Sequence, residues 1–167
     1  MGPLYHGNLS LAVDSDSCNL QHNRVLTGAS DNQILTEGAL WARAEAKMSV
    51  SMAMVEDRKH CREAWYNAGS AVEFALKAVI MRRERYNIWP SKEAKPELHT
   101  HNLRSLFRLA AIDLHSAPKA LRGSVRTALD WDRGHDYSPG TMKRSVARSM
   151  VNAVCGPEGV VAWLKTC

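Results

Sequence analysis

The amino-acid sequence predicts an all-α fold, an up-and-down bundle of about five helices built around a long central antiparallel hairpin. Apolar residues recur three or four positions apart in several separate segments, which is the spacing of one helix face. No segment has the pattern of a convincing strand. Hydrophobic residues make up 45% of the chain and charged residues 23%, so we expect a packed core rather than extensive disorder.

The length of 167 residues is typical of one domain. Residues 1–30 are rich in glycine, asparagine, aspartate and serine, which favour turns, so we expect an irregular N-terminal arm there. Residues 31–167 carry the helical patterns and are expected to form a single helical domain.

The first predicted helix begins after Ser30 or Asp31, because either side chain can cap the exposed N–H groups of a first turn. Its inward face is expected to be rich in alanine, so that a neighbouring helix can approach closely. That face consists of Leu35, Ala39, Ala42, Ala46, Val50 and Ala53.

The second predicted helix follows a charged turn at residues 56–60 and runs to about Tyr86. Glu73 and Lys77 stand four residues apart on it and are expected to pair on the surface. Gly69 lowers helix propensity and is expected to mark a close packing contact. The core positions of this helix are Trp65, Ala68, Val72, Leu76 and Val79.

Three further helices are predicted after a loop of about a dozen residues that contains Pro90 and Pro96. The third begins at about Asn102, and its apolar face extends to Leu114. Pro118 suits the first turn of the fourth helix, where its missing N–H is not needed. Thr141 is expected to cap the fifth helix, and Gly156–Pro157 to break it before a last helical turn.

The sequence suggests neither a membrane segment nor a bound metal. No run of about 18 apolar residues is present, and no basic stretch precedes an apolar one at the N-terminus. The four cysteines lack metal-binding spacing and are expected to be free thiols, which favours the cytoplasm. His99 and His101 have no third ligand at a suitable spacing, so no metal or other cofactor is expected.

Three segments resemble motifs of HEPN (higher eukaryote and prokaryote nucleotide-binding) domains. Residues 71–80, AVEFALKAVI, resemble the A-x-E-x-x-L-K centre of the family's second long helix. Residues 101–107, HNLRSLF, resemble the H-(D/N)-L-x-x-L segment that opens its third helix. Residues 132–139, DRGHDYSP, stand where the family often has a turn rich in Arg and Tyr. The resemblance covers roughly residues 35–165.

The resemblance implies a helical bundle that forms a homodimer and acts on a nucleotide or RNA. Members of the family serve in prokaryotic toxin–antitoxin and phage-defence systems, often encoded beside a minimal nucleotidyltransferase. An antitoxin or a nucleotidyltransferase is therefore an implied partner. Catalytic members are metal-independent RNases with an R-x(4–6)-H motif, whereas others only bind. We therefore expect a binding module, with an RNase toxin and a structural dimerising adaptor as the alternatives.

Two groups of residues are candidates for the chemistry. Arg108 and His115 match R-x6-H and, on one helix, would lie two turns apart on a shared face, as a phosphate-stabilising guanidinium and a general acid or base. The other group is the turn with Arg133, His135 and Tyr137, which departs from the catalytic spacing.

The turn group suits binding of phosphate and base. We expect the turn to border a concave basic site shared with helix faces that bear Arg104, Arg108 or Arg144. The net charge of +5 is compatible with a polyanionic ligand.

Overall fold

The structure, a computed structural model, describes residues 2, 35–134 and 141–167 of the chain. These residues form six α-helices joined by loops and short 3-10 turns, and none of them belongs to a strand. The predicted all-α bundle is thus confirmed. The helices all belong to one compact unit, Ile34–Cys167. The arm predicted for residues 1–30 lies outside the described residues apart from Gly2.

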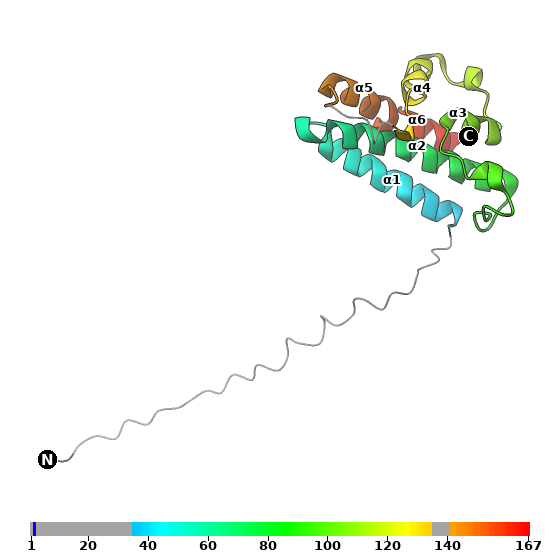
Figure 1. Cartoon of the computed structure of the whole chain (residues 1–167), viewed down its shortest axis with the longest axis horizontal. Helices are drawn as coiled ribbons and strands as arrows, with labels where there is room; N and C mark the ends of the chain where they lie inside the picture. Colours follow the sequence, from blue (N-terminus) through cyan, green and yellow to red (C-terminus); the bar gives the residue numbers. More distant parts are fainter. Residues whose placement is uncertain (1, 3–34, 135–140) are drawn as a thin grey trace. The chain divides into compact units, whose positions relative to one another are not determined.

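Helices α1 (Glu37–Met54) and α2 (Cys61–Glu84) form the predicted antiparallel hairpin, drawn in cyan and green in Figure 1. Helix α1 begins later than predicted, at the Thr36 cap rather than at Ser30 or Asp31. The Thr36 hydroxyl accepts a hydrogen bond from the Ala39 amide at 3.2 Å. The acidic Glu37 that follows also favours a helix start, because a negative charge there complements the helix dipole.

The predicted inward face of α1 is wrong. Leu40, Ala44 and Ser51 are the buried residues of this helix, and the Ser51 hydroxyl donates to the Ala64 carbonyl at 2.6 Å. The predicted stripe faces outward instead, with Val50 38% exposed and Ala42, Ala46 and Ala53 also exposed. Small residues occur on both sides of α1, so their spacing alone does not distinguish the two faces.

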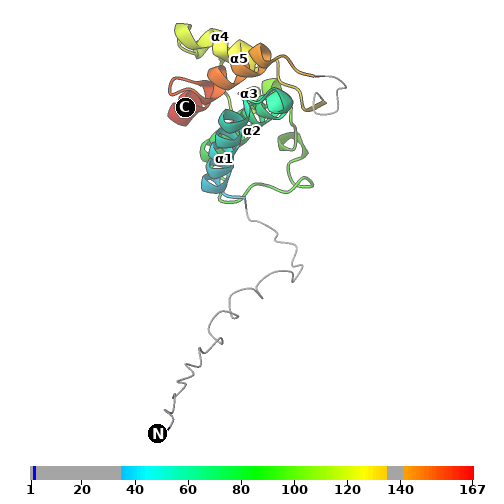
Figure 2. The same ribbon diagram turned by 90° about the vertical axis from the view of Figure 1, so that its left-hand side faces the viewer.

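Helix α2 is the central element of the bundle. It lies between α1 on one side and α5 (Arg144–Cys155) and α6 (Val160–Thr166) on the other (Figures 1 and 2). Because neighbours cover it on several sides, its buried residues extend well beyond one apolar stripe. All five predicted core positions are buried, namely Trp65, Ala68, Val72, Leu76 and Val79.

Helix α3 (Leu103–Leu109) begins as predicted, with the Asn102 side chain accepting from the Ser105 amide at 2.9 Å. It ends earlier than its apolar pattern suggests. Ala111 adopts a left-handed φ of 49°, and the Ile112 amide donates to the Phe107 carbonyl at 3.1 Å. This bond closes a Schellman-type helix end that packs Ile112 into the core.

The remaining helices follow the predicted order. The short turn η4 (Lys119–Leu121) after Pro118 leads into α4 (Arg122–Ala128). Thr141 does not cap α5, because Lys143 occupies the cap position and its side chain makes no capping bond. Helix α5 ends immediately before Gly156, as predicted. No helix in the described part of the chain is long and apolar enough to cross a membrane.

Candidate nucleotide-binding site

The residues predicted to form one basic site are distributed over three separate hollows. Arg133 borders a hollow beside α2, Arg104 and Arg108 border one beside α3, and Arg144 borders one at the start of α5. The predicted neighbours of Arg133 are therefore not its neighbours in the fold. His135 and Tyr137 lie outside the described residues.

Arg108 and His115 border a common hollow of about 420 Å³, but they do not share a helix. Arg108 lies in the last turn of α3, whereas His115 lies in the turn η3 (Leu114–Ser116). The predicted shared helix face is wrong, because α3 has already ended at Leu109. Within the described segments no group hydrogen-bonds the His115 imidazole, so nothing there orients it as a general base.

A buried carboxylate, Glu73, is part of the lining of the hollow beside α2. Its side chain accepts a hydrogen bond from Lys77 Nζ at 2.7 Å and lies 2.9 Å from His101 Nδ1. The predicted Glu73–Lys77 pair therefore forms, but inside the protein, where the two side chains are only 8% and 12% exposed. Burial follows from the loop after α2, which the Trp89 amide ties to the Leu35 carbonyl at 2.8 Å.

His101 connects this carboxylate to Arg133. The Arg133 Nη1 atom lies 2.9 Å from His101 Nδ1 and 2.6 Å from Nε2. A neutral imidazole that donates its Nδ1 proton to Glu73 leaves Nε2 as the ring nitrogen that can accept from Arg133, and the approach of Nη1 to Nδ1 is then a contact without a hydrogen bond. The three side chains thus form a hydrogen-bonded chain from a buried carboxylate to an exposed guanidinium.

The walls of this hollow combine aromatic rings with cations around a volume of about 330 Å³. Lys77 Nζ lies 5.7 Å from the centre of the Trp89 ring, and Lys47 donates to the Asn67 side chain at 2.8 Å. Aromatic faces can stack on a base, and a guanidinium can bind a phosphate through two parallel hydrogen bonds. The lining includes Arg43, Lys47, Tyr66, Phe74, Lys77, Trp89, His99 and Arg133.

Glu73 had a signal in the sequence. A carboxylate at position 73 interrupts a helix segment that is otherwise apolar, and such a group needs a buried partner. Sequence spacing identifies Lys77 as one partner. It does not identify His101, which is 28 residues away and reaches Glu73 only through the course of the loop.

A comparison of the chain with protein-family models, curated proteins and solved structures finds no match. The HEPN resemblance therefore rests on the three motifs. The Glu of the first motif and the His of the second are the pair in contact, and Arg133 of the third touches that His.

Proposed function

We propose that the protein is a HEPN-like module that binds a nucleotide, or one nucleotide of an RNA, in the hollow around His101 and Arg133. The observation that supports this best is the Glu73–His101–Arg133 chain. It holds an exposed guanidinium at the edge of a hollow with aromatic walls.

Binding in this hollow requires no catalytic step. Arg133 keeps further N–H groups for a phosphate, because only Nη1 is used by His101. Lys47 lies in the same hollow and adds positive charge on the α1 side. Tyr66 and Trp89 are half-buried aromatic residues of the lining, and aromatic side chains are the kind on which a base stacks.

The proposal is tested by titrating a fluorescent nucleotide, first ATP and then UMP, into the wild type and Arg133→Ala at low salt. Loss of a charged hydrogen bond costs about 1.5–3 kcal/mol, so we expect affinity to fall about 10–100-fold. Arg126→Ala removes another exposed cation, which borders none of the three hollows, and should bind like the wild type. Equal binding by Arg133→Ala, or no binding by the wild type, would refute the proposal.

A second proposal concerns pairing of the chain with a copy of itself. The outward face of α1 combines small residues with Val50 and Met52, which are 38% and 49% exposed. Helices with small residues can approach closely, so this face suits a homodimer. A monomer of 18.6 kDa in light scattering at micromolar concentration would contradict it. If pairing occurs, Ala46→Glu should abolish it without unfolding the protein.

A further inference from the structure

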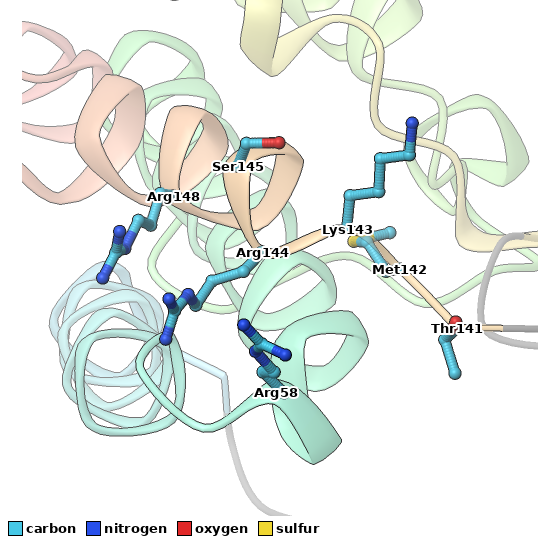
Figure 3. A pocket seen from close by; sticks show the side chains of 7 residues that line it. All are labelled: Arg58, Thr141, Met142, Lys143, Arg144, Ser145 and Arg148. Carbon is cyan, nitrogen blue, oxygen red and sulfur yellow. The ribbon is translucent and has the colours of Figure 1, made fainter.

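A strongly basic hollow of about 570 Å³ lies at the start of α5. Figure 3 shows the guanidinium groups of Arg58, Arg144 and Arg148 gathered in one part of it, whereas the Lys143 side chain extends in another direction. Arg58 belongs to the turn η1 (Arg58–His60), and the other two arginines belong to α5. Two elements far apart in sequence therefore bring three guanidinium groups to one hollow.

One of these arginines already binds a carboxylate at the edge of the hollow. Arg148 Nε donates to Glu56 Oε1 at 3.0 Å, and Arg148 Nη2 donates to Glu56 Oε2. The planar guanidinium thus holds both carboxylate oxygens at once, an arrangement that a carboxylate matches in shape as well as in charge. The pair shows which kind of group the arginines of this hollow can bind.

The other two guanidinium groups have no carboxylate partner among the described residues. Arg144 donates only to the Glu56 carbonyl, at 3.4 Å, and Arg58 takes part in no ion pair there. Like charges that converge repel one another, and a bound anion would remove that repulsion. The start of α5 adds partial positive charge, because no side chain caps it. The hollow is therefore suited to a further anionic group.

A smaller hollow of about 250 Å³ adjoins the basic one. The two hollows have three lining residues in common, Arg58, Thr141 and Met142, so they meet at a shared edge. The smaller hollow adds two cations and one carboxylate, Lys59, Arg62 and Glu63. Glu63 makes it less positive than the larger hollow. A ligand that reaches the cations of both hollows is therefore elongated and carries several negative groups.

We infer that these two adjoining hollows, the α5 basic site, are a docking site for an acidic peptide segment of a partner protein. Carboxylates of the peptide bind the two unpaired guanidinium groups, those of Arg58 and Arg144, in the way that Arg148 already binds one. The inference does not rest on the proposed function. The α5 basic site and the hollow around His101 have no described lining residue in common.

An acidic peptide suits the α5 basic site better than other anionic ligands do. None of the described residues that line it is aromatic, so it lacks platforms on which the bases of a nucleic acid strand stack. Met142 is half-buried at the shared edge and offers an apolar contact to the stem of a peptide side chain. A single inorganic anion is too small to reach both hollows. A membrane surface does not enter a hollow.

The test uses an octaglutamate peptide with an uncharged fluorescent label, titrated into the protein at low salt and followed by anisotropy. Octaglutamine with the same label is the uncharged control. We expect the wild type to bind octaglutamate alone, and its affinity to fall as salt screens the charges. Arg58→Ala/Arg144→Ala removes two charge-assisted contacts, so its affinity for octaglutamate should fall at least about tenfold.

Two further variants make this result specific. Lys119→Ala/Arg126→Ala removes two exposed cations that do not line the site and should bind octaglutamate like the wild type. Arg58→Lys/Arg144→Lys keeps both charges but loses the planar fork, so its affinity should lie between those of the wild type and the alanine double variant. Urea unfolding checks that each variant is folded. If the alanine double variant did not fold, undiminished affinity in the lysine double variant would refute the site.

Several outcomes would overturn the inference. These are the absence of octaglutamate binding by the wild type, equal binding of octaglutamine, or undiminished binding by a folded alanine double variant. Octauridylate or phosphatidylserine vesicles that bind more tightly than octaglutamate through the same two arginines would assign the site to nucleic acid or to a membrane instead. ATP binding should be unchanged in the alanine double variant, so the docking site and the proposed function can each fail alone.

Discussion

The indole ring of Trp131 lies directly against the Cα atom of Gly69. A Cβ atom on Gly69 would stand 2.0 Å from Trp131 Cδ1, far inside contact distance. Trp131 is only 5% exposed, and its ring centre is 5.8 Å from that of Tyr66. Arg133 follows two residues later, so the position of Trp131 also determines the position from which the Arg133 side chain reaches His101.

Gly69→Ala should therefore displace Trp131. We expect the free energy of unfolding in urea to fall by about 1–3 kcal/mol, the usual cost of overpacking a core. Nucleotide binding should weaken as well, because Arg133 moves with Trp131. Gly123→Ala on α4 is the control. A Cβ there meets nothing within 4 Å, so the substitution should be neutral or stabilising by up to about 1 kcal/mol. If the two variants unfolded at the same urea concentration, the close contact between Gly69 and Trp131 would be contradicted.

Glu73→Gln tests the hydrogen-bonded series Glu73–His101–Arg133. Removing the charge leaves the mostly buried Lys77 without its carboxylate, so we expect a loss of roughly 2–4 kcal/mol in chemical denaturation. Nitrogen NMR of His101 should show the Nδ1–H tautomer in the wild type and a mixture in the variant. Glu45→Gln breaks an exposed pair with Lys165, 2.7 Å apart, and should cost at most about 1 kcal/mol. If His101 had the same tautomer in Glu73→Gln as in the wild type, the hydrogen bond between Glu73 and His101 would be contradicted.

Ala111→Gly should stabilise the protein. Ala111 holds a φ of 49°, a conformation that suits glycine better than alanine. We expect a gain of about 0.5–1 kcal/mol in the free energy of unfolding. Ala110 has an ordinary helical φ of −71° and is buried, so Ala110→Gly should destabilise. If both variants lost stability to the same extent, the left-handed end of α3 would be in doubt.

The Glu56–Arg148 pair predicts a specific pH dependence. The hydrogen bond from Arg148 holds the pKa of Glu56 below its ordinary value of 4.5. Since the folded pKa is the lower one, the stabilisation is present above the unfolded pKa and disappears as pH falls through the folded pKa. NMR titration of Glu56 should show a depressed pKa that returns towards 4.5 in Arg148→Ala. The stability difference between the two proteins should vanish at acidic pH.

RNA cleavage provides a test of the catalytic alternative. Under the proposed function, the wild type leaves RNA intact in EDTA. Metal-independent cleavage that His115→Ala or Arg108→Ala abolishes would assign the protein to the RNases instead. Cleavage that survives in the double variant would have to come from other residues.

The sequence predicted the helices well and their faces less well. Apolar periodicity suffices for α2, because large apolar residues mark it. It fails for α1, where alanines occupy both sides of the helix. Which of these sides is buried depends on where α2 packs, and the sequence of α1 does not show that. The end of α3 at Ala111 was missed for another reason. An alanine with positive φ carries no signal in the sequence, so Leu114 and His115 appeared to continue the helix.

The arrangement of the candidate residues differs from the one that the sequence suggested. Arg133 was expected beside Arg104, Arg108 or Arg144, but it contacts His101 and borders the same hollow as Trp89 of the loop after α2. Spacing along a helix identifies i,i+4 partners such as Lys77. It does not show how a loop folds back over that helix, and here the loop decides which polar groups meet.

The hollow around His101 is lined by α1, by α2 and by the loop after α2, and we expect α2 and the loop to differ in amide exchange. Amide protons of α2 should exchange with deuterium only through global unfolding, because neighbouring helices cover them. The loop after α2 has few backbone hydrogen bonds, and Ile88 in it is 54% exposed, so its amides should exchange through local opening. A ligand bound in the hollow would then slow amide exchange in the loop and leave exchange in α2 unchanged. Hydrogen exchange would therefore report binding at this hollow without a labelled ligand.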